Sequence, residues 1–137
     1  MNRDELLNIL PHRNSMLLLD GAVRDGAAAR GHYTVRGDEW FLDGHFPGDP
    51  VVPGVILCEI MAQSVCVLLD GGTRGATPYF TGIDGARFKS VARPGDKLET
   101  ECVITKTRAP FYFAKGEVRV GGKLCAKADF SFYLGNA

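Results

Sequence analysis

The sequence lacks an excess of charge of either sign. Its 137 residues include 16 Lys plus Arg and 16 Asp plus Glu, so the formal net charge at neutral pH is zero. Proteins that bind nucleic acid usually concentrate basic residues to neutralise phosphates. The balance therefore gives no reason to expect a nucleic-acid partner, whereas a near-neutral surface has little repulsion to oppose self-association.

Long apolar runs are also missing. A membrane-spanning helix needs about 18 or more consecutive apolar residues, and the longest candidate, 55–69, is interrupted by Glu59, Gln63 and Ser64. The first residues, MNRDELLNIL, lack the basic start and the extended apolar core of a secretion signal. We therefore expect a cytoplasmic protein that does not span a membrane.

Cysteine pairs of the CxxC type are absent, and no histidine stands at a zinc-finger spacing from a cysteine. The four cysteines are Cys58, Cys66, Cys102 and Cys125. They are interpreted as small, buried, reduced thiols, with a cysteine nucleophile as the alternative. Neither interpretation includes a metal site.

What the sequence does contain is an apolar helix among strand-like segments. Helices are predicted at 4–9, capped near Asn2 or Asp4, and from 53 to about 70. Strands rich in Val, Phe, Tyr and Thr are predicted at 16–24, 28–35, 79–90, 97–106, 111–120 and 124–133, with a glycine- and proline-rich loop at 40–53. With 45% apolar residues, this order predicts one α+β domain, 1–137, whose antiparallel sheet wraps around one long central helix.

The long helix is apolar nearly all round, as expected when a sheet encloses it. Glu59 and Gln63 are exceptions that lie four residues apart on one stripe, which Cys66 continues. The stripe either faces solvent at the sheet edge or carries a buried functional carboxylate. A buried carboxyl group tends to stay protonated, which would suit Glu59 as a proton donor near neutral pH.

Two further groups precede this stripe. His45 lies in the loop before the helix and, beside a polarising group, would suit proton transfer at neutral pH, although alone it is an ordinary loop histidine. Gly54 starts the helix, where its N–H has no intrahelical partner and the helix dipole favours negative charge. Together with Glu59 they form a plausible set for removing a proton next to a carbonyl.

Four segments resemble the β-hydroxyacyl-acyl-carrier-protein dehydratases of bacterial type II fatty-acid synthesis. They are LPHR at 10–13, GHFPGDPVVPGV at 44–55, EIMAQ at 59–63 and FTGIDGARFKSVARPGD at 80–96. The resemblance covers most of the chain and implies a hot-dog fold. It also implies homodimers with two shared active sites, commonly assembled into a trimer of dimers, in which His45 and Glu59 of each site come from opposite subunits.

The resemblance further implies a role for each matching residue. His45 corresponds to the catalytic histidine and Glu59 to the catalytic acid. Gly54 corresponds to the glycine whose N–H binds the thioester carbonyl, and Val51 to the position whose carbonyl orients the histidine ring. Gln63 corresponds to the glutamine that holds the catalytic carboxyl or its water.

An acyl chain needs an apolar tunnel, and an acidic carrier protein needs a basic docking site. The tunnel candidates, each of which is more readily explained as plain core, are Phe46, Ile60, Phe80, Ile83, Phe88 and Phe113. The docking candidates, which could equally form a solvated strand face, are Arg87, Lys89 and Arg93. Of the remaining residues, His12 and Arg13 are expected to fix the chain turn, and His32 is assigned no role.

The implied reaction is dehydration of (3R)-hydroxyacyl-acyl carrier protein to the trans-2-enoyl form, with no metal or organic cofactor. Three alternatives remain: an enzyme that also isomerises the product to the cis-3-enoyl form, a hot-dog thioesterase, and a non-catalytic carrier-binding subunit. Departures from the family pattern at Asn14, Ser15, Asp49 and Ser90 bear on carrier docking rather than on the chemistry.

Overall fold

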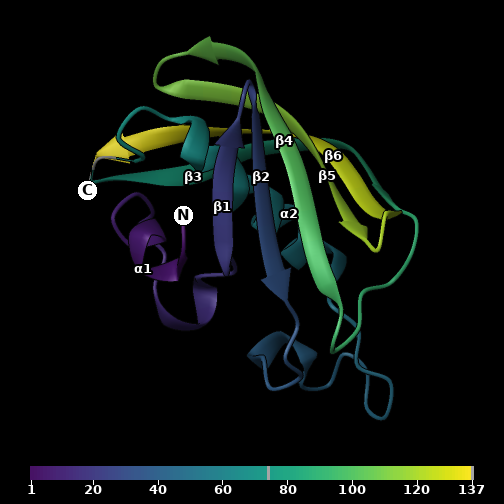
Figure 1. Ribbon diagram of the computed structural model, residues 1–137. Coiled ribbons are helices and arrows are strands. Elements are labelled where there is room, and N and C mark those ends of the chain that lie inside the picture. Colours follow the sequence, from purple (N-terminus) through teal and green to yellow (C-terminus); the bar gives the residue numbers. More distant parts are fainter. Residues whose placement is uncertain (74, 137) are drawn as a thin grey trace.

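The computed structural model describes residues 1–73 and 75–136 and places one long helix against a single antiparallel sheet (Figure 1). The helices are α1 (Arg3–Leu6) and α2 (Gly54–Val65), with 3-10 turns at Asn14–Met16, Trp40–Leu42 and Cys66–Leu68. The strands are β1 (Gly21–Asp25), β2 (Ala28–Thr34), β3 (Ala76–Phe88), β4 (Lys97–Arg108), β5 (Phe111–Val120) and β6 (Lys123–Asn136). Their order in the sheet is β1-β2-β4-β5-β6-β3, so the predicted α+β hot-dog arrangement is confirmed.

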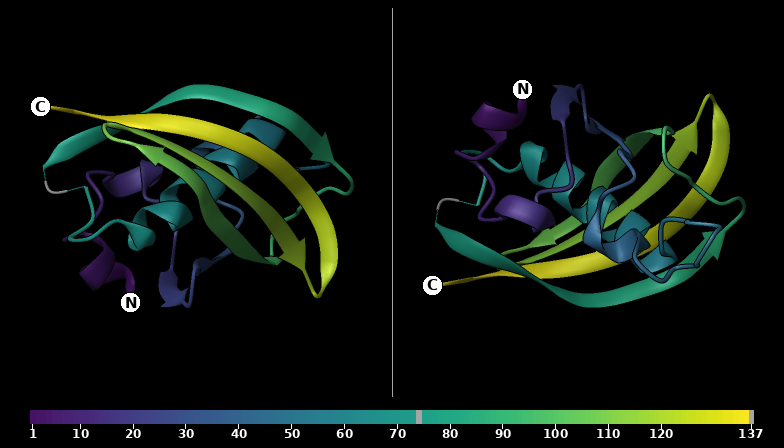
Figure 2. Two further views of the ribbon diagram at one scale, coloured as in Figure 1. Left: turned by 90° about the horizontal axis from the view of Figure 1, so that it is seen from above. Right: turned by 90° about the horizontal axis from the view of Figure 1, so that it is seen from below.

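The sheet packs one of its faces against α2. Residues of β4 alternate between exposed and buried, and Leu98, Thr100 and Cys102 lie on the buried face. Figure 2 shows the long strands β3 to β6 curving over α2, which lies against their concave side. The helix therefore contacts the sheet over much of its length.

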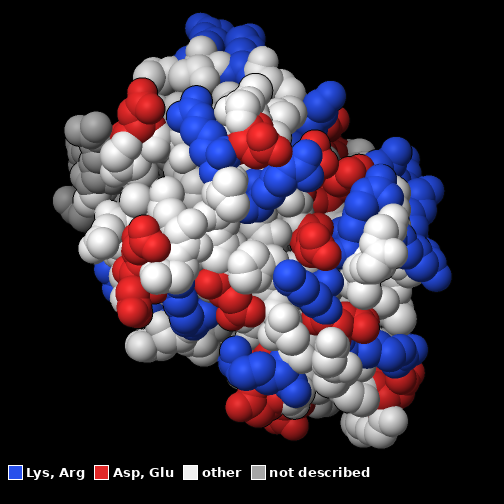
Figure 3. All heavy atoms as spheres, viewed as in Figure 1, with Lys and Arg blue, Asp and Glu red and all other residues white. Residues whose placement is uncertain are grey.

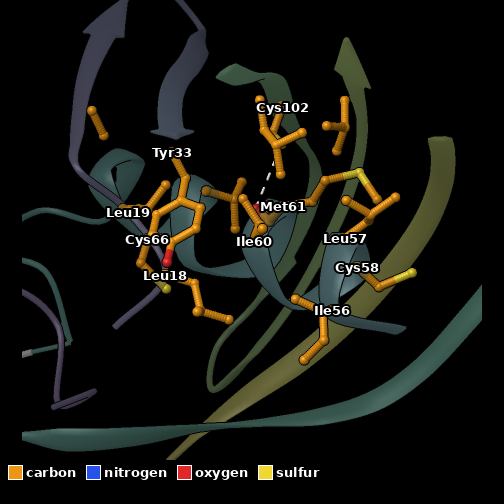
Figure 4. Packing of buried hydrophobic residues seen from close by; sticks show 14 of the residues in the cluster. Leu18, Leu19, Tyr33, Ile56, Leu57, Cys58, Ile60, Met61, Cys66 and Cys102 are labelled. Atoms are coloured by element: carbon orange, nitrogen blue, oxygen red, sulfur yellow. Dashed lines mark hydrogen bonds between the residues drawn. The ribbon is translucent and has the colours of Figure 1, made fainter. Parts of the chain in front are cut away.

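Helix α2 supplies the centre of the core. Ile60 and Met61 are fully buried in a cluster with Tyr33 of β2 and Cys102 of β4 (Figure 4). The Cys102 thiol donates a hydrogen bond of 3.5 Å to the Met61 carbonyl, and the dashed line in Figure 4 marks this contact. Burial of side chains of this size stabilises a fold by about 1.5–3 kcal/mol each, so the helix and sheet hold each other in place.

A short polar chain fixes how closely α2 approaches β2 and β4. The Ser64 hydroxyl donates to the Ile60 carbonyl at 2.8 Å and accepts from the Thr100 hydroxyl at 2.7 Å. The Thr100 hydroxyl in turn accepts from the Gly31 N–H at 2.9 Å. A Cβ at Gly31 would lie 2.6 Å from Ser64 Oγ, so glycine is required where the helix meets this strand.

The long helix ends earlier than predicted. The α-helix stops at Val65 and tightens into a 3-10 turn, because the Cys66 N–H donates to the carbonyls of both Gln63 and Ser64. The chain is extended at Leu69. The predicted helical residues beyond this turn are therefore not α-helical.

The prediction of a strand at 16–24 was wrong over its first half. The Leu18 N–H donates to the side-chain oxygen of Gln63 at 2.9 Å, and the Met16 carbonyl accepts from the Gln63 amide at 2.8 Å. A side chain of α2 thus takes the hydrogen bonds that a neighbouring strand would otherwise make. Strand β1 begins only at Gly21.

Strand β3 forms one edge of the sheet. Within the described residues it pairs with β6 alone, which leaves the other edge of a 13-residue strand without a partner strand. Four large apolar side chains on this strand are exposed, namely Tyr79, Phe80, Ile83 and Phe88. A long, apolar, unpaired edge is a typical surface for pairing with another chain.

The outer face of the sheet carries charges of both signs. Figure 3 shows basic and acidic side chains interspersed on this face without a large patch of one sign. Arg30, for example, pairs with both Asp25 and Glu101. Among the described residues, no helix reaches the length and apolarity that a membrane span requires.

Candidate active site

The loop before α2 holds the His45 ring by a backbone contact. Its Nδ1 lies 3.0 Å from the Val51 carbonyl oxygen. Because a carbonyl oxygen only accepts, Nδ1 carries the proton in this contact, and Nε2 of a neutral ring keeps its lone pair. The Val51 N–H also donates to the His45 carbonyl at 2.8 Å, so both residues are fixed together. This arrangement leaves Nε2 able to accept a proton.

A tight turn and a neighbouring loop support this contact. Phe46 and Asp49 exchange two backbone hydrogen bonds of 3.1 and 2.9 Å, and the Phe46 ring stacks on the His45 ring with centroids 4.2 Å apart. The Asp49 carboxylate forms an ion pair with Arg93, which belongs to the connection between β3 and β4. The loop is therefore tied to the sheet as well as to α2.

Gly54 is the first residue of α2, so its N–H has no acceptor within the helix. The Phe88 ring lies directly over it, and a Cβ added at Gly54 would come within 2.8 Å of that ring. Any larger residue would therefore displace the ring. The helix N-terminus presents backbone N–H groups and a partial positive charge, which suit an oxygen that develops negative charge.

Glu59 is held by two nitrogen atoms at one of its oxygens. Nε2 of Gln63 donates to Oε2 at 2.9 Å, and Nε2 of His12 lies 3.2 Å from the same oxygen. Gln63 is fully buried, whereas the Glu59 side chain is 20% exposed. The stripe on α2 thus faces neither bulk solvent nor a closed core, and Glu59 keeps one oxygen, Oε1, for a further partner.

Glu59 opens on a small cavity of about 20 Å³ between α2 and the edge of the sheet. The lining residues are His12, Glu59, Ala62, Gln63, Cys66, Pro78, Phe80 and Phe132. Phe80 is thereby the tunnel candidate that the structure brings to Glu59. His45 does not line this cavity, so the structure gathers the predicted site residues into two groups, one around His45 and one around Glu59.

The contact between His12 and Glu59 was missed by the sequence interpretation, which gave His12 and Arg13 a role in the chain turn. Arg13 does have that role, because its guanidinium donates to the carbonyls of Leu7, Leu10 and His12 at 2.6–2.9 Å. The His12 side chain instead points at Glu59. The LPHR segment at 10–13 was the only feature of the sequence that pointed to a role for His12.

The other candidates lie in varied surroundings. Ile60 is fully buried in the core, and Phe113 lies on the face of β5 opposite the buried Ala114, away from α2. Phe46, Ile83 and Phe88 are exposed apolar side chains. The docking candidates are also exposed: Arg93 pairs with Asp49, the Arg87 guanidinium donates to the Ala86 carbonyl at 2.9 Å, and Lys89 lies just beyond β3.

All four cysteines are free and buried. Burial raises the pKa of the Cys66 thiol to about 12, and the nearby Glu59 charge adds to this effect. Burial likewise raises the pKa of Cys102 to about 12 and raises the pKa of Cys58. A raised pKa disfavours the reactive thiolate. In the described part of the chain, no group of three or more His, Cys, Asp or Glu side chains could hold a metal ion.

Comparison with known proteins assigns the chain to one family. A family model described as the FabA-like domain matches residues 10–129. The 3-hydroxyacyl-acyl-carrier-protein dehydratase FabZ of Bacillus velezensis is 40% identical over 139 residues, covering 98% of this chain and 99% of that protein. The chain belongs to the FabZ-type dehydratase family. The FabZ of a Caulobacter species is similarly 41% identical over 133 residues, covering 93% of this chain and 82% of that protein.

Solved structures agree at the level of the fold. The dehydratase heterocomplex ApeI:P of Xenorhabdus doucetiae superposes with a TM-score of 0.81 at 21% identity, covering 96% of this chain and 91% of that one. The predicted FabZ-type family, the dehydratase function that it implies and the hot-dog fold are therefore confirmed.

Proposed function

We propose that this FabZ-type chain removes water from (3R)-hydroxyacyl chains carried on acyl carrier protein, giving the trans-2-enoyl thioester in fatty-acid biosynthesis. In this proposal residues 1–137 act as one domain of a cytoplasmic enzyme. The observation that carries the catalytic assignment is the contact of 3.0 Å between His45 Nδ1 and the Val51 carbonyl. It leaves Nε2 as a base near the N-terminus of α2, where an N–H can polarise the thioester carbonyl.

In the proposed reaction, Nε2 of His45 takes a proton from C2 of the hydroxyacyl thioester. The Gly54 N–H stabilises the negative charge that develops on the thioester oxygen. Glu59 of the partner subunit gives a proton to the C3 hydroxyl, which leaves as water. The electron pair of the broken C2–H bond forms the C2–C3 double bond, and solvent then returns the proton from His45 to the carboxylate. During the elimination itself, side chains and the Gly54 backbone supply every proton and charge contact, and solvent takes part only in the return of the proton.

The two groups of site residues explain why we propose a homodimer with two shared active sites. Glu59 follows Gly54 by five positions along the helix, a rise of about 7–8 Å along the axis, and His45 does not line the Glu59 cavity. The exposed edge of β3 carries Phe80, which lines that cavity, and Phe88, which covers Gly54. Pairing of two β3 edges would bring the His45 group of one subunit to the Glu59 group of the other. A trimer of such dimers is our proposal for the larger assembly.

For carrier docking we propose Arg87 and Lys89 as the main contacts, because both side chains are exposed beside Phe88. Arg93 contributes less in this proposal, since Asp49 already neutralises part of its charge. Asp49 is one of the departures from the family pattern, and its negative charge beside Arg93 makes this part of the docking surface less basic.

Product analysis with (3R)-hydroxyacyl-acyl carrier protein of medium chain length tests the proposed activity. We expect trans-2-enoyl product alone, identified by chromatography and mass spectrometry. Accumulation of the cis-3-enoyl product would make the enzyme a dehydratase that also isomerises. Release of free acid would mean a thioesterase, and unchanged substrate would mean a non-catalytic carrier-binding subunit.

A further inference from the structure

The His12 ring makes one polar contact in the described structure, and that contact is with Glu59. Its Nε2 lies 3.2 Å from Glu59 Oε2, and its side chain is 17% exposed. Its Nδ1 is buried and has no hydrogen-bond partner among the described residues. A buried polar atom without a partner costs stability, so the chain keeps a histidine here at a cost that an apolar residue would avoid.

The hydrogen bonds around Gln63 fix the direction of the contacts at Glu59. The Gln63 Oε1 accepts from the Leu18 N–H, so its Nε2 is the amide nitrogen and donates both to the Met16 carbonyl and to Glu59 Oε2. Both amide protons of Gln63 are therefore used. Glu59 Oε2 is an acceptor in this network, and a proton on Glu59 belongs on Oε1.

Burial of Nδ1 also determines the tautomer of His12. An imidazolium would bury an unpaired N–H on Nδ1 together with a charge, which is more costly than burying a bare lone pair. The neutral ring with its proton on Nε2 donates to Glu59 Oε2 and leaves only the lone pair of Nδ1 unpaired. Two N–H donors, from His12 and Gln63, then converge on one carboxyl oxygen.

We propose that His12 is a positioning residue that, with Gln63, holds Glu59 Oε2 as an acceptor and so presents the proton on Oε1 to the leaving hydroxyl group. The inference rests on the proposed role of Glu59 as the catalytic acid. It does not depend on the chain turn, because Arg13 makes the hydrogen bonds that hold the turn. A carboxyl group free to rotate would present its proton to the substrate for only part of the time.

Substitution of His12 by Gln and by Asn distinguishes a role in positioning Glu59 from a role in holding the fold. The amide nitrogen of His12→Gln can replace Nε2 and reach Glu59, whereas that of His12→Asn corresponds to Nδ1 and falls short. We expect His12→Asn and His12→Leu to lower kcat about 10- to 100-fold, because the lost hydrogen bond is to a carboxyl group that gains negative charge as its proton leaves, and to change KM less than about twofold. His12→Gln should recover kcat to within about threefold of wild type.

The control and the coupling test decide the outcome. His32→Leu removes another half-buried histidine, on β2, and should leave kcat unchanged. In a Glu59→Gln background, His12→Asn should cause no further loss, because its effect passes through the carboxyl group. Wild-type kcat in His12→Asn, or equal losses in folded His12→Asn and His12→Gln, would overturn the positioning role. High activity of Glu59→Gln alone would instead overturn the proposed catalytic role of Glu59.

Discussion

The carbonyl oxygen of Val51 lies 3.0 Å from Nδ1 of His45 and determines which ring nitrogen can act as a base. The contact comes from the backbone of Val51, so the side chain at that position does not create it. The turn between Phe46 and Asp49 folds the chain back, so that the Val51 carbonyl reaches the His45 ring. The proton-accepting state of His45 is therefore a property of the loop conformation, and the base can be tested without disturbing the loop.

Substitution His45→Asn tests the base while preserving its backbone contact. The amide nitrogen of asparagine can occupy the place of Nδ1 and donate to the Val51 carbonyl, but nothing replaces Nε2. We expect kcat to fall by about 10²–10⁴-fold, the usual contribution of a positioned general base. The circular dichroism spectrum and the melting temperature should stay close to those of wild type. His32→Asn is the matched control, and near-full turnover in His45→Asn would disprove the assignment.

Most of the architecture followed from local patterns. The bounds of β5 were predicted as observed, and β4 begins at the predicted Lys97, because alternation and turn residues mark these strands. The polar stripe on α2 was also found from spacing alone, and Glu59 and Gln63 do share a hydrogen bond. These features depend on residues close together in the sequence.

Errors arose where contacts join distant segments. Gln63 accepts a hydrogen bond from the backbone of Leu18, 45 residues away. Because of this contact, the first half of the strand predicted at 16–24 does not form. The contact between His12 and Glu59 joins the segment that follows α1 to the middle of α2. Periodicity carries no signal for either contact, since both depend on how α2 and the N-terminal segment pack in three dimensions.

Sharing of active sites can be tested with mixed dimers. His45→Ala and Glu59→Gln chains carrying different affinity tags should each be inactive as homodimers. Heterodimers purified through both tags would contain one site with both residues intact and one site with neither, so we expect about half of the wild-type activity. Heterodimers as inactive as the parents would show that each site uses the two residues of a single subunit.

Docking of the carrier protein on Arg87 and Lys89 predicts that KM for carrier-bound substrate depends on the salt concentration. Opposite charges across an interface speed association, and salt screens them. We expect Arg87→Glu and Lys89→Glu to raise KM for carrier-bound substrate severalfold and to weaken its dependence on salt, with kcat unchanged. Arg108→Glu, at the end of β4, is the matched control for an exposed arginine. If KM responds equally to all three substitutions, the docking surface does not lie beside Phe88.

The close approach of the Phe88 ring to Gly54 predicts that the effect of a substitution at Gly54 can be reversed by a second substitution at Phe88. A Cβ at Gly54 would lie 2.8 Å from the Phe88 ring, so Gly54→Ala should destabilise the fold by about 1–3 kcal/mol through overpacking. Activity should also fall, because the ring or the helix N-terminus must move. The added Phe88→Leu substitution removes the clash and should restore most of the stability in urea unfolding. Failure of this rescue would mean that the glycine is needed for another reason.

Acid stability should depend on Glu39, at the start of the loop that carries His45. Burial alone would raise its pKa, but hydrogen bonds from the Tyr33 hydroxyl at 2.6 Å and from the Arg36 and Gly37 amides at 2.9 and 2.8 Å lower the pKa below its usual value. A carboxyl group whose pKa is lower in the folded state stabilises the fold above its unfolded pKa and loses this effect as the pH falls through the folded pKa.

The Glu39→Gln variant should therefore be less stable than wild type by about 1–3 kcal/mol at pH 7. The difference should shrink steadily below about pH 5, as the wild-type carboxylate takes up a proton. Urea unfolding of both proteins between pH 7 and pH 3.5 measures this, with Glu99→Gln, an exposed carboxylate on β4, as the matched control. A stability difference that stays constant over this range would mean that packing, and not the charge of Glu39, holds the loop.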